Sequence, residues 1–313
     1  MLNKNICVLG GGGFVGHHLV SRLAAKGWRV TVPARQRQRV NDLLVLPTVD
    51  VVEADIHDPA ALARLFAGQD VVINLVGILH GRQKDFVRVH VKLPHKVMDA
   101  CRAAGVKRLL HMSALGADIA SRSFYQHSKG EGEKLVLEPG RSHDLDVTVF
   151  RPSVIFGPGD SFLNLFAGLL KLAPVLPLAN AGARFQPVHV ADVARAYVEA
   201  IDDPDTYGQA YNLCGPKAYT LEELVRLVAD ALGLKRTILP LGAGLSWWFA
   251  RLMELKPGRK LMTRDNHYAM QVDNVCPDGY PARFGVPQPL EASLDYLYGA
   301  RGRYDGYREA ARR

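Results

Sequence analysis

The sequence predicts an α/β fold in which helices cover both faces of a mainly parallel β-sheet. Two observations predict it. Short apolar runs alternate with segments of helical spacing through the first half of the chain, which is the order that strand–helix–strand units produce. Most of these runs are continuously apolar, as at residues 6–9 and 71–73, and strands buried on both faces have this composition.

The elements of this sheet follow one another in regular order. Strands are predicted at residues 5–10, 28–33, 49–54, 70–76, 107–113 and 145–150, and helices at 14–26, 58–66, 86–104 and 123–138. Gly105 is expected to cap the third helix, because glycine readily adopts the left-handed conformation that ends a helix. The predicted architecture is therefore a doubly wound sheet of the Rossmann type.

The pattern becomes irregular beyond residue 150, where prolines occur at positions 152, 158, 174, 177 and 187. An amphipathic helix is expected at 190–201. Thr220 and Glu223 form a capping box before a helix at 221–232, which Gly233 would close. We predict a sheet domain at 1–155, to which 184–204 return, a smaller substrate lobe at 156–183 and 205–300, and a basic tail at 301–313.

Length and composition indicate a soluble, folded protein. The chain has 313 residues, of which 48% are hydrophobic, and this is enough for a large buried core. Its N-terminal residues lack the apolar region and cleavage site of a secretory signal. The apolar stretch at 162–183 is interrupted by prolines and polar residues, so it does not predict a membrane-spanning helix. We therefore expect a cytoplasmic location.

The formal net charge of +8 is compatible with nucleic acid, an anionic membrane or an anionic cofactor. Arginines cluster at 35–39 and again at 301–313, but no nucleic-acid-binding motif accompanies them, so no nucleic-acid partner is expected. The cysteines include no C-x-x-C pair and the histidines form no H-E-x-x-H pattern. No metal site is expected for that reason.

A run of glycines joins the first predicted strand to the first helix. It comprises residues 10–13 and is followed by Phe14, Val15 and Gly16. Such a turn lets the backbone approach a pyrophosphate closely, while the helix N-terminus holds the anion. Two patterns fit this run: G-x-G-x-x-G beginning at Gly11 and G-x-x-G-x-x-G beginning at Gly10. Both include Gly13 and Gly16. We predict a dinucleotide site here; the alternative is a glycine turn without a ligand.

The residues after the second strand favour NADP(H) over NAD(H). An acidic residue about 20 positions beyond the glycines binds the ribose of NAD, whereas an arginine suits the 2′-phosphate of NADP. Arg35 follows this strand, and no carboxylate occurs between Trp28 and Asn41. NADP(H) is therefore preferred, and NAD(H) stays open. Asp55 and Ile56 are placed like an adenine-binding pair, although Asp55 can equally cap the next helix.

A tyrosine and a lysine stand four residues apart in the helix after the fifth strand. Tyr125 and Lys129 share one face of that helix, and an ammonium group favours ionisation of a nearby phenol. Ser113 ends the fifth strand, at the sheet edge where ligands bind in this architecture. The three residues are candidates for catalysis, with Lys129 also able to bind the nicotinamide ribose. Alternatively, Ser113 satisfies the local backbone.

Together these motifs resemble an atypical extended short-chain dehydrogenase/reductase, a family related to NAD-dependent epimerases and dehydratases. Further segments that carry the resemblance are N-L-V-G at 74–77, H-M-S-A-L-G at 111–116, R-P-S-V-I-F-G at 151–157, V-H-V-A-D-V-A at 188–194 and Y-N-L-C-G-P at 211–216. Residues 151–164 look similar to the NADPH-binding accessory subunits of respiratory complex I and their bacterial relatives. The segment at 113–116 departs from the longer pattern of nucleotide-sugar epimerases.

The resemblance implies a set of cofactor contacts spread over the predicted sheet. They are Gly10, Gly13, Phe14, Val15, Gly16, Arg35, Asp55, Ile56, Val76, Gly77, Tyr125, Lys129, Pro152, Ser153 and Val154. One expected function is that of an oxidoreductase or epimerase, in which Tyr125 transfers a proton while hydride passes to or from the nicotinamide. Its small-molecule substrate would be quinone-related or nucleotide-sugar-like. The alternative is a non-catalytic NADP(H)-binding accessory or assembly protein.

The aromatic segment at 245–253 leaves the choice of partners open. It is followed by Lys256, Arg259 and Lys260, a combination that suits a lipophilic substrate site, contact with an anionic membrane, or packing of the second lobe. Peripheral association with the inner face of a membrane, association with a respiratory complex, and the oligomeric state therefore stay open.

Overall fold

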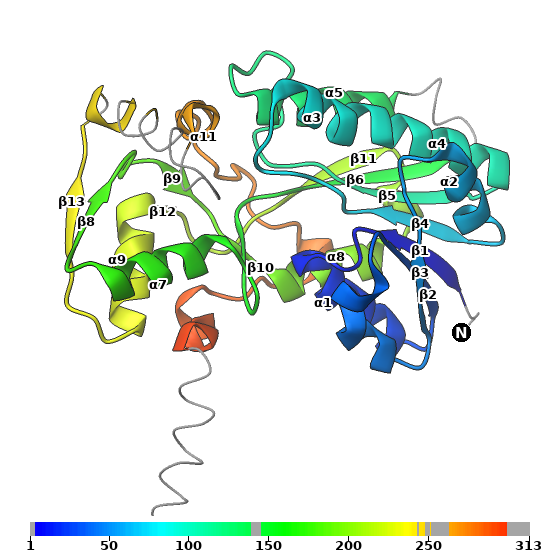
Figure 1. Cartoon of the computed structure of the whole chain (residues 1–313), viewed down its shortest axis with the longest axis horizontal. Helices are drawn as coiled ribbons and strands as arrows, with labels where there is room; N and C mark the ends of the chain where they lie inside the picture. Colours follow the sequence, from blue (N-terminus) through cyan, green and yellow to red (C-terminus); the bar gives the residue numbers. More distant parts are fainter. Residues whose placement is uncertain (1–3, 139–144, 243, 248–250, 252–262, 299–313) are drawn as a thin grey trace, which may run out of the picture. The chain divides into compact units, whose positions relative to one another are not determined.

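The computed structural model describes residues 4–138, 145–242, 244–247, 251 and 263–298 (Figure 1). It divides into two compact units. Unit 1 takes its described residues from Met1–Ser153, Val190–Leu213 and Cys276–Val286, and unit 2 takes its own from Val154–His189, Cys214–Val275 and Pro287–Arg313.

Unit 1 is built on a seven-stranded sheet with the order β11-β6-β5-β4-β1-β2-β3. The strands are β1 (Asn5–Leu9), β2 (Arg29–Ala34), β3 (Val49–Glu53), β4 (Val71–Asn74), β5 (Arg108–Met112), β6 (Asp146–Pro152) and β11 (Gln209–Leu213). All neighbouring strands are parallel. The chain continues to one side of β1 through β2 and β3, and to the other through β4, β5 and β6, so ligands are expected at the carboxyl ends of β1 and β4. The predicted doubly wound fold is confirmed.

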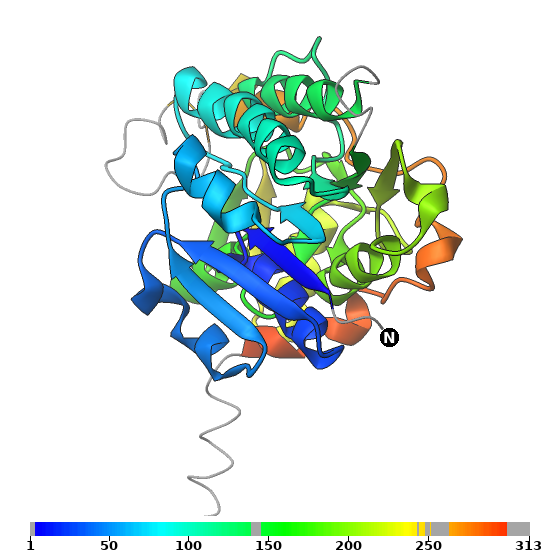
Figure 2. The ribbon, with the colours of Figure 1, turned by 90° about the vertical axis from the view of Figure 1, so that its right-hand side faces the viewer.

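Helices cover both faces of this sheet, as Figures 1 and 2 show: α2, α4 and α5 lie on one face, and α1 and α8 on the other. Their bounds are α1 (Phe14–Ala25), α2 (Pro59–Phe66), α3 (Gln83–Phe86), α4 (Leu93–Ala104), α5 (Phe124–Leu137) and α8 (Val190–Ala200), with short turns η1 (Arg37–Val45), η3 (Pro204–Thr206) and η4 (Ala282–Phe284). Gly105 caps α4 with a φ of 72°, as predicted. Between α3 and α4 the chain forms a π-helical turn, η2 (Val87–Lys92), which interrupts the helix predicted at 86–104.

The described part of unit 2 contains two main helices and three short strand pairs. The helices are α7 (Phe162–Leu172) and α9 (Leu221–Ala231), with the short α11 (Arg264–Ala269) and the turns η5 (Glu291–Ser293) and η6 (Asp295–Tyr298). The strands are β7 (Ile155–Phe156), β8 (Val175–Leu178), β9 (Arg184–Phe185), β10 (Val188–His189), β12 (Tyr219–Thr220) and β13 (Thr237–Pro240); β7 pairs with β10, β8 with β13 and β9 with β12.

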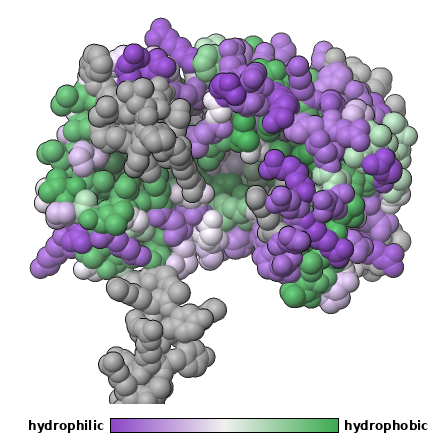
Figure 3. Space-filling view, in the orientation of Figure 1, coloured by the Kyte–Doolittle hydropathy of each residue, from purple (hydrophilic) through white to green (hydrophobic). Residues whose placement is uncertain are grey.

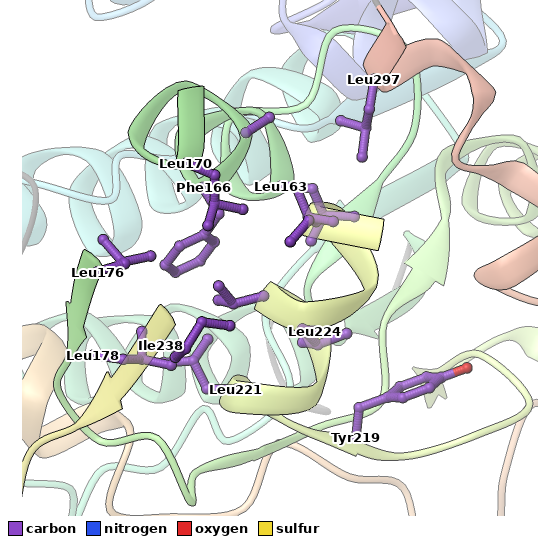
Figure 4. Packing of buried hydrophobic residues seen from close by; sticks show 14 of the residues in the cluster. Leu163, Phe166, Leu170, Leu176, Leu178, Tyr219, Leu221, Leu224, Ile238 and Leu297 are labelled. Carbon is purple, nitrogen blue, oxygen red and sulfur yellow. The ribbon is translucent and has the colours of Figure 1, made fainter. Parts of the chain in front are cut away.

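A separate apolar core holds unit 2 together (Figure 4). Leu163, Phe166 and Leu170 of α7 face Leu224 of α9 and Leu176 of β8 in this core. The capping box predicted before α9 is present, because Thr220 Oγ1 accepts a hydrogen bond from the Glu223 amide at 3.2 Å and the Thr220 amide donates to the Glu223 carboxylate at 2.7 Å. This reciprocal cap fixes the start of α9.

Three segments lie in a different part of the fold from the one predicted. Residues 184–189 belong to unit 2 and not to the sheet domain, to which the chain returns only at Val190. Residues 209–213 form β11, which joins the large sheet beside β6 instead of the second lobe. Residues 276–286 also belong to unit 1, where the Tyr280 hydroxyl donates to the Asp192 carbonyl at 2.9 Å and Arg195 donates to the Phe284 carbonyl at 2.6 Å. An edge strand and an irregular return segment need no continuous apolar run, so their sequences did not show where they pack. The predicted tail at 301–313 lies outside the described residues.

Candidate active site

The glycine loop lies between β1 and α1, at the carboxyl edge of the sheet. A Cβ atom at Gly16 would lie 2.3 Å from the Gly10 carbonyl oxygen, and one at Gly13 would lie 3.2 Å from the same atom. Gly10 itself has a φ of +80°, which favours glycine. A Cβ at Gly12 would first meet a side chain. Backbone crowding therefore requires glycine at position 16, and the positive φ favours it at position 10. A Cβ atom at Gly11 would lie 3.1 Å from the Val8 carbonyl oxygen, so crowding does not choose between the two glycine spacings.

The N-terminus of α1 fits the pyrophosphate of a dinucleotide. Gly13 is the N-cap of this 12-residue helix and makes no side-chain capping bond, and the first turn contains no acidic residue. The amides of Phe14, Val15 and Gly16 belong to the first turn, where N–H groups lack partners within the helix. An anion is favoured there by these amides and by the helix dipole.

The segments after β2 and β3 form the end of this edge that is predicted to hold the adenosine. Arg35 follows β2 and is exposed. Asp55 follows β3, and its Oδ1 accepts from the His57 amide at 2.9 Å. The helix α2 is capped by Asp58, whose side chain accepts from the Ala60 amide at 3.0 Å. Asp55 is therefore not the helix cap, and its hydrogen bond to His57 stabilises the turn between β3 and α2.

Cations gather around His57 at this end. Lys96 Nζ donates to the His57 carbonyl at 2.6 Å. The pKa of His57 is lowered by partial burial and by the charges of Arg88, Lys96 and Arg35, while Asp55 opposes them. The segment between β3 and α2 therefore lies in a positive field.

The segment after β4 runs beside the lysine predicted to be catalytic. Val76 donates its amide hydrogen to Asn74 Oδ1 at 3.1 Å, and the Asn74 amide group contacts His111 Nδ1 at 3.2 Å. A Cβ atom at Gly77 would lie 3.2 Å from Lys129 Nζ. The absence of a side chain at position 77 therefore leaves room for the lysine.

Tyr125 and Lys129 lie one turn apart on α5, and both face a buried environment. The Tyr125 ring is half-buried and stands edge-on to His90, with 5.6 Å between ring centroids, and burial raises its pKa to about 12. Lys129 is only 5% exposed, and its Nζ donates to the Met112 carbonyl at 3.0 Å. Burial lowers the pKa of Lys129 to about 8, and the charge of Glu133 opposes that effect.

Ser113 lies next to the residue that accepts this hydrogen bond. Its amide donates to the Phe150 carbonyl at 2.8 Å, and its side chain is 2% exposed. Its hydroxyl group is buried and has no hydrogen-bond partner among the described residues. Buried hydroxyl groups are normally paired, so this one is available to a ligand oxygen.

His90 is part of the site, although sequence reasoning did not select it. Its Nε2 accepts from the Ile78 amide at 3.1 Å, which assigns the ring proton to Nδ1, and Nδ1 then donates to Ser128 Oγ at 2.8 Å. Burial, followed by the charges of Lys129 and His111, lowers the pKa of His90 to about 2. The neutral ring therefore links the segment after β4 to α5. A lone histidine in a helical pattern carries no sequence signal for this role.

The π-turn packs against α5 at unusually short range. A Cβ atom at Gly132 would lie 1.9 Å from the His90 carbonyl oxygen. No alanine can be placed there without moving one of the two backbones. Gly132 therefore fixes the distance between α5 and the π-turn.

The structure brings most of the predicted residues to one sheet edge. The glycine loop, Val76, Gly77, Ser113, Tyr125 and Lys129 lie at the carboxyl ends of β1, β4 and β5, and Ile56 lies with Asp55 beyond β3. Pro152 ends β6 and Ser153 follows it in unit 1, whereas Val154 opens unit 2.

The remaining expectations concern metals, membranes and the aromatic segment. No group of three or more metal-ligating side chains occurs within the described parts of the chain. None of the helices in those parts is long and apolar enough to cross a membrane. Leu172 is 85% and Leu245 64% exposed on unit 2, where apolar side chains are visible in Figure 3. Trp248 and residues 256–260 lie outside the described residues.

Comparisons with known proteins agree with this geometry. Residues 6–214 match the model of the NAD dependent epimerase/dehydratase family. The chain is 34% identical to NADH dehydrogenase [ubiquinone] 1 alpha subcomplex subunit 9 of Mus musculus mitochondria, over 91% of the chain and 77% of that subunit. It is 31% identical to a ceramide reductase of Caulobacter vibrioides, over 94% of the chain and 95% of that enzyme.

The fold also matches solved structures of low sequence identity. One is the UDP-N-acetylglucosamine 4-epimerase from Methanobrevibacter ruminantium, solved in complex with UDP-N-acetylmuramic acid. It superposes with a TM-score of 0.72 at 18% identity and covers 95% of this chain and 98% of the epimerase. At this identity the match supports the fold alone.

Proposed function

The chain belongs to the NAD dependent epimerase/dehydratase family, and within it we propose an NADP(H)-dependent oxidoreductase that reduces a lipophilic carbonyl compound. One observation carries the proposal: the buried Ser113 hydroxyl lacks a partner and directly follows Met112, whose carbonyl holds the Lys129 ammonium group. A hydroxyl and an ammonium group at one ligand-binding edge suit the oxygen of a reacting carbonyl group and the ribose of a cofactor.

The chemistry assigned to each side chain follows from its environment. The cofactor, when bound, supplies the hydride. Tyr125 donates its proton to the carbonyl oxygen and is protonated at neutral pH, because burial raises its pKa to about 12. Lys129 stabilises the resulting phenolate, and Ser113 donates a hydrogen bond to the substrate oxygen. An ammonium group can donate three hydrogen bonds, so Lys129 can hold the cofactor ribose as well as Met112.

The preference for NADP(H) rests on the cations at the adenosine end. Arg35 follows β2, and Arg88 and Lys96 act on the same segment of chain. A 2′-phosphate would be attracted to this field, whereas the ribose of NAD(H) would gain little from it. Arg35→Gln is expected to weaken NADPH binding about tenfold and leave NADH binding unchanged, because it removes a single charged contact. Calorimetry measures both affinities, with the exposed Arg64→Gln as the matched control.

The lipophilic substrate class rests on side chains close to Tyr125. Phe124, the neighbour of Tyr125 in the chain, is 48% exposed. Ile119 is 49% exposed and lies in the loop that packs on α5 at Gly130. Leu79 is 60% exposed and follows Ile78, whose amide donates to His90. Large exposed apolar side chains beside a candidate site favour an apolar ligand. The relative named ceramide reductase supports a lipid-like carbonyl compound over a nucleotide sugar.

A second candidate function is that of a non-catalytic NADP(H)-binding accessory protein. It is favoured by the 34% identity to a subunit of NADH dehydrogenase. In that case Tyr125 and Lys129 would serve only to bind the cofactor. The two functions differ in whether removal of the phenol hydroxyl has any effect.

Tyr125→Phe separates these functions. We expect kcat to fall about 1,000-fold in a screen of long-chain ketones, quinones and nucleotide sugars, as for the loss of a general acid, while the Kd for NADPH stays within about twofold. Tyr211→Phe makes the same chemical change on β11 and serves as the control. The accessory function is supported instead if Tyr125→Phe keeps every measurable reaction and cellular phenotype while Gly13→Asp abolishes both cofactor binding and function.

A further inference from the structure

The face of α5 that carries Tyr125 and Lys129 continues to Glu133. The three residues are four positions apart, so they follow one another along one side of the helix. Glu133 is only 7% exposed. One of its oxygens, Oε1, accepts hydrogen bonds from Nε of Arg151, at 2.9 Å, and from Nη2 of the same residue. Arg151 lies on β6, next to the predicted cofactor residue Pro152.

The second oxygen of Glu133 is not explained by this ion pair. Oε2 is buried and has no hydrogen-bond partner within the described part of the chain. A buried carboxylate with an unpaired oxygen is unfavourable unless another cation interacts with its charge. Lys129 is such a cation, because it lies one helical turn away, is itself buried, and makes its described hydrogen bond to a neutral carbonyl group.

We propose that Glu133 is a positioning residue for the reaction: its carboxylate sets how strongly Lys129 holds its proton, and Arg151 limits this effect by sharing that carboxylate. The kinetic part of this inference rests on the proposed function; the effect on the lysine does not. Protonated Lys129 is the form that stabilises the phenolate of Tyr125. Glu133 would therefore set the pH above which Lys129 loses its proton and kcat falls.

The other titratable groups that face Lys129 carry no charge near neutral pH. His90 approaches from η2 and His111 from β5, and burial lowers their pKa values to about 2 and about 3. Tyr125, on α5 itself, is protonated, with a pKa of about 12. The segment after β4 contributes Gly77, which has no side chain. Burial lowers the pKa of Lys129 to about 8, and Glu133 is the charge that opposes this.

The test measures the protonation of Lys129 in the full-length protein with ¹³C-labelled lysine by NMR, and the pH dependence of kcat in parallel. Glu133→Gln removes the anion, so we expect the midpoint for Lys129 and the high-pH limb of kcat to move down by about one unit. Arg151→Met frees the carboxylate, so both should move up. Glu131→Gln is the control, because Glu131 pairs with His127 on an exposed part of the same helix.

Opposite shifts distinguish this role from a structural one. Glu133→Gln and Arg151→Met both break the ion pair, so both should lose stability. If the pair is merely structural, the Lys129 midpoints stay where they are or move in the same direction in the two variants. Either result overturns the proposal. If Glu133→Gln fails to fold, Arg151→Met decides alone: a Lys129 midpoint that moves up supports the proposal, and one that stays or moves down overturns it. Absence of turnover in the wild type would contradict the proposed function while the NMR titration still decides this inference.

Discussion

The two ends of β5 carry buried polar side chains with opposite hydrogen-bonding states. Arg108 begins the strand and is 4% exposed; its guanidinium group donates to the carbonyl oxygens of Asp146 and Ala200 and to the hydroxyl groups of Thr148 and Thr206, at 2.7–2.9 Å. It also lies over the Tyr207 ring, 4.5 Å from the centroid. Ser113 follows the other end of the strand, equally buried, and its hydroxyl group has no described partner.

This difference separates a structural polar group from a candidate functional one. Arg108 makes four described hydrogen bonds, and of its three guanidinium nitrogens only Nε has no partner among the described residues. Such a saturated network ties strands and loops together. Burying a hydroxyl group without a hydrogen bond destabilises the fold. The burial of the Ser113 hydroxyl group is therefore better explained by a bound ligand. The comparison predicts that stability depends on one end of β5 and activity on the other.

Arg108→Met tests the structural end and should have the largest effect. Removing the guanidinium group takes a charged donor away from buried oxygens of Thr148, Ala200 and Thr206, so the free energy of unfolding should fall by about 3 kcal/mol. Urea denaturation at pH 7 measures this, and NADPH affinity of the folded variant should not change. Arg29→Met, at the exposed start of β2, should alter stability by less than about 0.5 kcal/mol. Equal stabilities of the two variants would break the comparison.

Ser113→Ala tests the other end. We expect kcat to fall about 100-fold, as on loss of one donor to the reacting oxygen. The free energy of unfolding should stay unchanged or rise, because no described hydrogen bond of the side chain is lost. Ser21→Ala, on the exposed side of α1, provides the control for both measurements. A clear loss of stability together with full activity would place Ser113 among the structural residues.

His111, inside β5, should make the free energy of unfolding depend on pH. Burial, then the charge of Lys129, lowers its pKa to about 3, whereas an unfolded histidine has a pKa of about 6.5. As the pH falls from 6.5 towards 3, the unfolded chain therefore binds a proton that the folded protein excludes. Stability should fall by up to about 1.4 kcal/mol per pH unit from this group.

Urea denaturation between pH 7 and pH 4 measures that slope. His111→Asn should reduce the slope by the amount that corresponds to about one proton. The control is His95→Asn, which removes an exposed histidine paired with Asp99 and should not reduce the slope in this way. An unchanged slope in His111→Asn would show that His111 takes up its proton as readily in the folded protein as in the unfolded chain.

The sequence predicted the centre of the sheet and the glycine loop well, for a physical reason. Strands buried on both faces are apolar throughout, and β1, β4 and β5 begin and end within two residues of their predicted bounds. Glycines that prevent backbone collisions cannot be replaced, so Gly10 and Gly16 stand out in the sequence. The places of Tyr125 and Lys129 followed from helical spacing.

Other features depend on contacts between distant segments and left no local pattern. The π-turn at 87–92 has ordinary helical spacing, so neither it nor the bonds of His90 to Ile78 and Ser128 could be read from the sequence. The edge strand β11 is half polar. The pairing of Glu133 with Arg151 joins residues 18 positions apart in two different elements, and the sequence pattern did not suggest it.

The glycine at position 132 has a consequence for how inactive variants would be interpreted. Since a methyl group there would meet the His90 carbonyl oxygen at 1.9 Å, Gly132→Ala would push α5 and the π-turn apart. Phenol, ammonium and carboxylate would then shift together and keep their mutual spacing, but not their distance from the nucleotide. Such a variant would retain every candidate reactive group and still lose function through misalignment, a defect that a list of the site residues would not reveal.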